Sequence, residues 1–211
     1  IICNPKPETL AKYEKRKLDE EENRRKLGKL ATAKAETHDG HAIHLLANID
    51  SLEDVDAARI NGADGIGLVR SEYLIIQRQH FPTEEEQFEW YQQLAERMYP
   101  HPVTIRAFDV GSDKYAEGLP HEDNPALGMR GIRFLLHRKD IFKSQIKAVL
   151  RASQHRNIRL MLPMIATTEE LQQSLELINK CKRQLRRSNT PFDDTMPVGI
   201  MIETPAAAIM A

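Results

Sequence analysis

The sequence predicts an α/β fold in which parallel strands alternate with helices, preceded by one long charged helix. Short apolar runs suited to buried strands alternate with stretches whose apolar residues recur at helical spacing. Three of the apolar runs end abruptly in a charged residue: 66–69 in Arg70, 103–105 in Arg106 and 198–202 in Glu203. Functional side chains of βα barrels gather at the carboxyl ends of the strands, so we expect these three charges to lie together.

The length, net charge and cysteine content of the chain limit the kinds of function it can have. The 211 residues suffice for one domain, or one domain with a small appendage. Thirty basic and 31 acidic residues give a net charge of −1, which argues against nucleic acid or an anionic membrane as partner. No apolar run approaches the roughly 20 residues of a membrane span. Cys3 and Cys181 are too few for a disulfide framework and predict reduced, cytosolic thiols.

The first 37 residues are predicted to precede the domain proper. Without an initiator methionine, the chain is expected to be cut from something longer, with residues 1–7 as the tail of a preceding domain. A charged helix is expected from residue 8 to about residue 35. Favourable i,i+4 ion pairs are expected along it: Glu20–Arg24, Glu21–Arg25 and Glu22–Lys26. Because its apolar content is thin, we assign residues 8–37 to an exposed linker and 38–211 to the domain.

The first half of the domain contains three predicted strands, at 44–49, 66–69 and 103–108. Between the first two, Ser51 and Asp54 are expected to cap a helix that ends at Gly62. Glycines at 62, 65 and 67 allow close backbone approach, but their order does not fit a dinucleotide-binding fingerprint. Before the third strand, Thr83 and Glu86 form a capping-box pattern for a helix that Pro100 stops.

The second half begins with a long polar connection, 111–128, whose length favours a functional surface. A short helix or strand is expected at 129–136, and Asp140 is expected to cap the next helix. Strands follow at 158–165, interrupted by Pro163, and at 198–202, separated by a helix that Thr167 caps. Five strands do not close an eight-stranded barrel, and another helix is expected to begin where the chain ends.

Several charged residues have a simpler interpretation than a site. Taken alone, Arg70 could equally form a surface ion pair. An anion site is favoured only because Arg106 and Glu203 also stand at the ends of apolar runs. Glu72 is interpreted as holding Arg70 in place. His38, His41 and His44 resemble a metal triplet, but Gly40 breaks any helix there and no carboxylate or cysteine completes the set.

Five segments, in this order and spacing, resemble signature segments of Enzyme I, the phosphoenolpyruvate (PEP)–protein phosphotransferase family of the sugar phosphotransferase system. They are GIGLVRSE at 65–72, PTEEEQ at 82–87, IRAFDVGSDK at 105–114, NPALGMRGIR at 124–133 and GIMIETPA at 199–206. Asn4-Pro5 also resembles the end of that family's phosphohistidine domain. The segments do not separate the sugar branch from its nitrogen-regulatory paralogue.

The resemblance implies a partial (β/α)8 TIM barrel of about five βα units that binds PEP with Mg²⁺. It also implies a cytoplasmic homodimer that passes the phosphoryl group through a histidine to the histidine-containing phosphocarrier protein. The family's substrate arginines fall on Arg70 and Arg106, with Arg130 as a further guanidinium, and its first magnesium carboxylate falls on Glu203. These types suit the ligands, because guanidinium forks match phosphate and carboxylate, and Mg²⁺ takes carboxylate and substrate oxygens.

The resemblance also implies that parts of the active site lie outside this chain. The family's phosphorylated histidine falls before residue 1, and its Asn-Asp pair, a further arginine and its reactive cysteine fall beyond residue 211, so the chain alone is expected to be inactive. Ala107 and Ser112 replace a usual threonine and glycine. Two alternatives stay open: the related barrel of pyruvate phosphate dikinase or PEP synthase, and a non-catalytic PEP-sensing dimerisation module.

Overall fold

The computed structural model describes residues 2–78, 80–111, 124 and 128–211 and contains one five-stranded sheet. The strands pair in chain order and every neighbouring pair is parallel, as predicted. They are β1 (Leu46–Ile49), β2 (Gly65–Arg70), β3 (Val103–Arg106), β4 (Ile158–Leu162) and β5 (Val198–Ile200). A parallel sheet in sequence order requires a crossover helix between successive strands, which is the pattern of a βα barrel.

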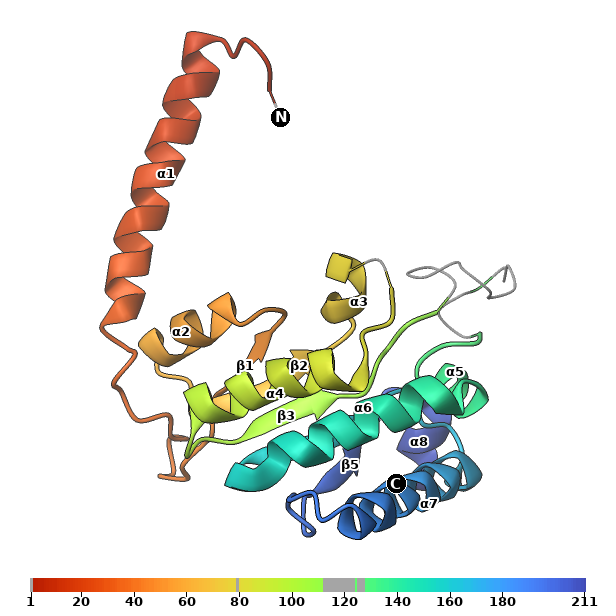
Figure 1. Cartoon of the computed structure of the whole chain (residues 1–211). Helices are drawn as coiled ribbons and strands as arrows, with labels where there is room; N and C mark the ends of the chain where they lie inside the picture. Colours follow the sequence, from red (N-terminus) through yellow and green to blue (C-terminus); the bar gives the residue numbers. More distant parts are fainter. Residues whose placement is uncertain (1, 79, 112–123, 125–127) are drawn as a thin grey trace.

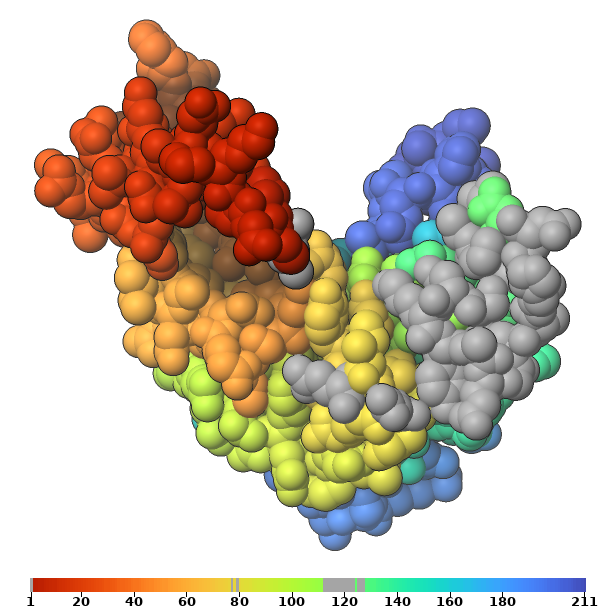
Figure 2. Space-filling model, turned by 90° about the horizontal axis from the view of Figure 1, so that it is seen from above, coloured from red at the N-terminus to blue at the C-terminus, as the bar shows by residue number. Residues whose placement is uncertain are grey.

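The crossover helices cover one face of the sheet (Figure 1). They are α2 (Glu53–Ile60), α4 (Glu84–Met98), α6 (Lys139–Ala152) and α7 (Thr168–Arg187). Helix α4 packs against α6, and α6 packs against α7. Seen from above, the red and orange N-terminal part and the blue C-terminal residues stand apart, with an open gap between them (Figure 2). The expected fold, part of a βα barrel with five βα units, is confirmed.

Shorter helices occupy the ends of the strands. They are α3 (Tyr73–Arg78) after β2, α5 (Ile132–His137) before α6, and α8 (Pro205–Met210) after β5, and a 3₁₀ turn (Ser153–His155) follows α6. Helix α8 was expected only to begin at the chain end, and α3 was not predicted. The connection predicted to be a functional surface is mostly outside the described residues, which leave out 112–123, Ser112 among them, and 125–127.

The charged helix α1 (Pro7–Gly28) projects away from the sheet and buries none of its residues (Figure 1). Glu22 pairs with Lys26 at 2.9 Å as predicted, but Glu20 pairs with Arg16 and Glu21 with Lys17 in place of Arg24 and Arg25. The helix also ends at Gly28, short of residue 35. Glycine costs about 1 kcal/mol relative to alanine inside a helix, and turns follow it, ending in a bridge between Glu36 and Ala42.

Two of the four predicted helix caps are confirmed. Thr83 and Thr167 each accept a hydrogen bond from the backbone N–H of the glutamate three residues later, and that glutamate binds the threonine N–H in return. The other two predicted N-caps are displaced by one or two residues, although Ser51 does pair with Asp54, whose carboxylate accepts from the Ser51 N–H and Oγ. Leu52 occupies the cap of α2, while Arg138 precedes α6 and holds Asp140 through its guanidinium.

Glycines bring β2 close to neighbouring backbone, as predicted. A Cβ on Gly62, whose φ is +79°, would lie 1.9 Å from the carbonyl oxygen of Ala31. A Cβ on Gly65 would lie 2.6 Å from the carbonyl oxygen of Pro102.

Four strands are shorter than predicted. Strand β4, for example, ends at Leu162 because Pro163 has no N–H to donate to the neighbouring strand. Within the described part of the chain, no helix has the length and apolar character needed to cross a membrane.

Candidate functional site

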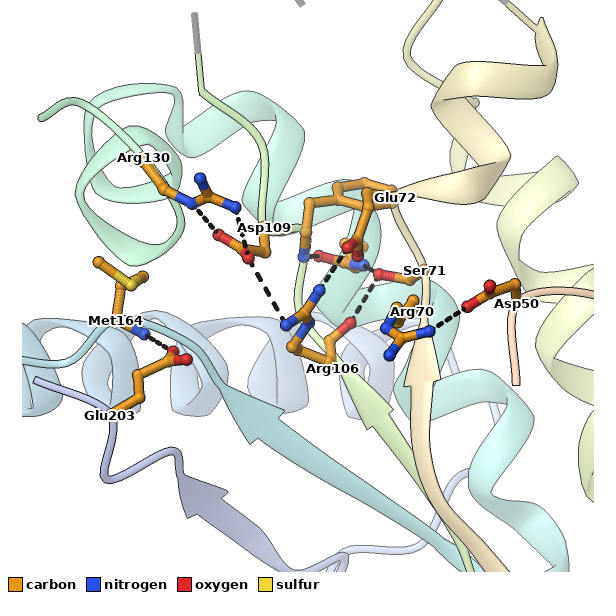
Figure 3. A network of polar contacts seen from close by, with 11 residues as sticks. Asp50, Arg70, Ser71, Glu72, Arg106, Asp109, Arg130, Met164 and Glu203 are labelled. Carbon is orange, nitrogen blue, oxygen red and sulfur yellow. Dashed lines mark hydrogen bonds and ion pairs between the residues drawn. The ribbon is translucent and has the colours of Figure 1, made fainter. Parts of the chain in front are cut away.

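Arg70 and Arg106 lie side by side at the carboxyl ends of β2 and β3, because the two residues are register partners in the sheet. The Arg70 guanidinium is partly exposed and donates to Asp50 Oδ1 at 3.0 Å. Asp50 directly follows β1, so neighbouring strand ends supply the two partners (Figure 3). This exposed pair is the weaker anchor of the site, since partly solvated ion pairs contribute about 0–1 kcal/mol.

Arg106 is held between two carboxylates, Glu72 and Asp109. Its Nη2 forms a short ion pair with Glu72, and its Nη1 lies 3.5 Å from Asp109 Oδ2. The side chains of Arg106 and Glu72 are 9% and 2% exposed, so this pair is removed from water. Glu72 follows Arg70 in sequence but holds Arg106, so the interpretation that it fixes Arg70 was wrong. The turn at Ser71 redirects the chain between the two residues.

Asp109 joins Arg106 to Arg130. Its carboxylate accepts two hydrogen bonds from Arg130, from Nε at 2.8 Å and from Nη2 at 3.0 Å. Such a bidentate pair fixes the plane of the guanidinium as well as its position. Arg130 precedes α5, so one carboxylate connects the end of β3 to a segment 21 residues later (Figure 3).

Glu203 reaches the same region through Met164 and Gly131. The backbone N–H of Met164 donates to Glu203 Oε1 at 2.7 Å (Figure 3). Met164 in turn packs on Gly131, where an added Cβ would lie 2.9 Å from Met164 Cγ and 3.3 Å from Asp109 Oδ1. Gly131 also has φ +56° and ψ −127°, which few residues other than glycine adopt. The structure thus brings all four predicted site residues to one end of the sheet.

The match to known proteins agrees with this geometry. Residues 24–211 match the family model described as PEP-utilising enzyme, PEP-binding domain. The chain belongs to this family. It is 43% identical to the phosphoenolpyruvate-protein phosphotransferases of Bacillus sp. (strain S) and Geobacillus stearothermophilus, and 40% identical to that of Haemophilus influenzae. Each alignment covers the whole of this chain and 37% of the relative, so the chain spans little more than a third of those proteins.

The charges of this PEP-binding domain are nearly balanced at the site. Arg70, Arg106 and Arg130 lie among four carboxylates, from Asp50, Glu72, Asp109 and Glu203. Arg106 Nε is buried and has no hydrogen-bond partner among the described residues. Such an orphaned donor indicates a missing water or ligand acceptor, since buried polar groups are otherwise paired. The arrangement therefore fixes two guanidiniums at one end of the sheet, and Arg106 Nε is the one of their donors that is buried with no acceptor in the described part of the chain.

Sequence reasoning did not identify Asp50 and Asp109 as partners of the arginines, and it assigned Glu72 to Arg70 instead of Arg106. Asp50, Glu72 and Asp109 each come within three residues of a strand end, and this placement was the signal that could have identified them. Ser71 and Gln145 gave no comparable signal. Ser71 Oγ donates to the backbone oxygen of Arg106 at 2.6 Å, and Gln145 Nε2 donates to Ser71 Oγ at 3.0 Å.

Proposed function

We propose that this domain binds PEP at the carboxyl ends of its strands, within a longer PEP–protein phosphotransferase. That protein would pass the phosphoryl group through a histidine to the histidine-containing phosphocarrier protein. The arrangement of Arg106, Asp109 and Arg130 carries the proposal, because one buried carboxylate fixes two guanidiniums before any ligand arrives. PEP offers a phosphate and a carboxylate, and both match guanidinium forks.

The proposed role of the arginines is electrostatic. Their N–H donors would hold the phosphate and carboxylate oxygens of PEP and offset the charge that develops as the phosphoryl group leaves. Since Glu72 and Asp109 already hold Arg106 in one orientation, binding orders fewer side chains and loses less entropy. Arg70, more exposed and held by Asp50 among the described residues, would close the site from the β1 side.

The balance of charge favours a divalent cation beside PEP. Four carboxylates face three guanidiniums, so the protein groups alone do not neutralise a ligand that carries a phosphate and a carboxylate. Glu203 is exposed, and its Oε2 makes no hydrogen bond within the described part of the chain. Among the described residues no three His, Cys, Asp or Glu side chains form a metal cluster. We infer that Glu203 would hold Mg²⁺ together with substrate oxygens, as that ion prefers, and the bound ion would further neutralise the phosphoryl group.

The names of the relatives support a phosphotransferase over the related barrels of pyruvate phosphate dikinase and PEP synthase. We further propose that the complete protein is a homodimer and works in the cytoplasm. The cytoplasmic location is consistent with Cys3 and Cys181, which are both free thiols. Light scattering on the complete protein tests whether it is a homodimer.

Labelled PEP tests the proposed function. The complete protein, incubated with PEP carrying a radioactive phosphoryl group and Mg²⁺, should form an acid-labile phosphohistidine that adding the phosphocarrier protein discharges. The 211-residue chain alone should take up no label. Stoichiometric label on any of its eight histidines would contradict the assignment. PEP binding by calorimetry without any label in the complete protein would instead favour the non-catalytic sensing module.

A further inference from the structure

A buried glutamine on α6, Gln145, lies beneath the two strand ends that carry the proposed PEP arginines. Its side chain is 0% exposed and makes three hydrogen bonds. Oε1 accepts from the backbone N–H of Phe108 at 3.0 Å, and Nε2 donates to Ser71 Oγ and to Tyr91 Oη, both at 3.0 Å. One amide therefore contacts segments that follow β2 and β3 and a helix between them.

The chemistry of these partners permits only one orientation of the amide. The Phe108 N–H can only donate, so it must meet the carbonyl oxygen of Gln145. Nε2 then supplies two protons, one to each hydroxyl. Those hydroxyls pass their own protons onward, Ser71 to the Arg106 carbonyl oxygen at 2.6 Å and Tyr91 to Gln87 Oε1 at 3.4 Å. A glutamate would offer too few donors, and an asparagine is one carbon shorter.

The network holds the backbone on both sides of Arg106. Ser71 binds the Arg106 carbonyl, and Gln145 binds the N–H two residues later, at Phe108. Ser71 itself lies between Arg70 and Glu72, so the same contact sets the start of the turn from which Glu72 reaches Arg106. The ladder between β2 and β3 ends at the Arg70–Arg106 pair, and beyond it these side-chain bonds take over the connection.

We propose that Gln145 is a positioning residue for PEP: by joining Ser71 and Phe108, it fixes Arg70 and Arg106 relative to each other. This inference rests on the proposed function. A shift of about 1 Å in a substrate-binding group can reduce turnover about a hundredfold, so a buried residue that fixes two such groups controls the reaction without contacting the substrate.

Tyr91 anchors the other side of the network. Burial raises the pKa of its hydroxyl, which therefore stays protonated and keeps donating to Gln87. Gln87 Nε2 then donates to the Pro82 carbonyl at 2.9 Å, just before α4 begins. Because Tyr91 accepts a separate proton of Gln145 Nε2, its hydroxyl can be removed while the bonds from Gln145 to Ser71 and Phe108 remain.

The test uses the complete protein with Gln145→Met, which keeps the length of the side chain and removes its hydrogen bonds. The matched control is Asn157→Leu. Asn157 is another buried amide, but it binds the Ala95 and His101 carbonyls at the opposite end of the sheet. Both variants should lose thermal stability, yet only Gln145→Met should raise the KM for PEP, by about tenfold or more.

Two further variants keep the proposal falsifiable. Ser71→Ala removes the bond to Arg106 and leaves Gln145 in place, so the KM for PEP should also rise. Tyr91→Phe should lower stability with a smaller effect on KM than Ser71→Ala. Phosphoryl exchange between the protein and its phosphocarrier, which does not involve PEP, should stay at the wild-type rate in all of them.

Distinct outcomes separate this inference from the proposed function. A KM for PEP in both Gln145→Met and Ser71→Ala equal to that of Asn157→Leu would overturn the positioning role and leave the function intact. If Gln145→Met does not fold, Ser71→Ala alone decides. A wild-type protein that takes no phosphoryl group from PEP would instead refute the proposed function itself.

Discussion

The two ends of the sheet are stabilised by different chemistry. At the carboxyl ends, guanidiniums and carboxylates pair through side chains, several of them buried: Arg106 with Glu72 and Asp109, and Arg130 with Asp109. At the amino ends, the side chains bind mainly backbone groups, and the Asp64 carboxylate there accepts from the Leu45 N–H. Asn157 donates to two backbone carbonyls, and the Pro102 and Pro197 carbonyls accept strand N–H groups.

This difference separates what holds the fold from what serves the site. A buried ion pair gains little net stability, because the cost of removing two charges from water offsets their attraction. Neutral side chain to backbone bonds satisfy buried groups at a lower cost. Backbone groups thus supply most of the partners at the amino ends of the strands, while guanidinium–carboxylate pairs gather at the carboxyl ends. Variants at the two ends should therefore affect different measurements.

The largest effect is expected from Arg106→Ala in the complete protein. It removes a proposed PEP contact and also deprives the buried carboxylate of Glu72 of its guanidinium partner. We expect kcat/KM for PEP to fall at least about a hundredfold and stability to fall by about 3 kcal/mol.

The double variant Arg106→Met with Glu72→Leu sharpens this result. Replacing both charges by apolar groups should restore much of the stability and none of the activity. Denaturant melts and PEP kinetics on the same samples measure the two properties. Recovered activity in the double variant would remove Arg106 from the site.

Gly131→Ala should come next, with a loss in both properties. The new Cβ would lie 2.9 Å from Met164 Cγ and 3.3 Å from Asp109 Oδ1, at a φ of +56° that alanine adopts poorly. We expect a loss of about 1–3 kcal/mol and a raised KM for PEP, as Arg130 moves with its neighbour. Gly199→Ala on β5 is the control, because its Cβ would meet no atom within 4 Å. Equal effects in the two variants would contradict the account.

Glu203→Gln should change the dependence on metal while preserving the fold. The amide can still accept from the Met164 N–H but no longer attracts a cation. The Mg²⁺ concentration for half-maximal phosphoryl transfer should rise about tenfold with an unchanged melting temperature. An unchanged Mg²⁺ requirement would assign the metal to other groups.

Asp54→Asn should have the smallest effect, on stability at low pH. Hydrogen bonds, first from the Asp50 N–H, lower the pKa of Asp54 below its ordinary value of 3.8. A lowered pKa adds stability above the ordinary value, which is lost as the pH falls through the lower folded value. Wild type should therefore lose stability more steeply than Asp54→Asn as the pH falls below about 4. Parallel pH profiles of the two proteins would contradict this.

Local sequence signals predicted much of this fold. Capping boxes, such as those at Thr83 and Thr167, and apolar strand runs involve residues close in sequence, so they could be predicted from the sequence. The end of α1 at Gly28 and the exact N-caps of α2 and α6 were misjudged. The Asp140 carboxylate pairs with Arg138, two residues earlier, and helix propensity does not specify such a local ion pair.

The candidate site was predictable only in part. A charge at the end of an apolar run identified Arg70, Arg106 and Glu203, and the family resemblance added Arg130. Asp50, Glu72 and Asp109 follow strand ends, but which arginine each would bind was not predictable, since Asp109 meets Arg130 across 21 residues and Gln145 meets Ser71 across 74. Such contacts depend on how helices and strands pack. A buried glutamine has no pattern that distinguishes it in sequence from an exposed one.

Calorimetry with PEP and Mg²⁺ on the complete protein tests the central claim most directly. Three samples suffice: wild type, Arg106→Ala and Arg159→Ala, which removes an exposed arginine nearer the amino end of β4. We predict that wild type and Arg159→Ala bind PEP with equal affinity and that Arg106→Ala binds at least about thirtyfold more weakly, a loss of about 2 kcal/mol. Equal binding by all three proteins would contradict a PEP site at the carboxyl ends of these strands.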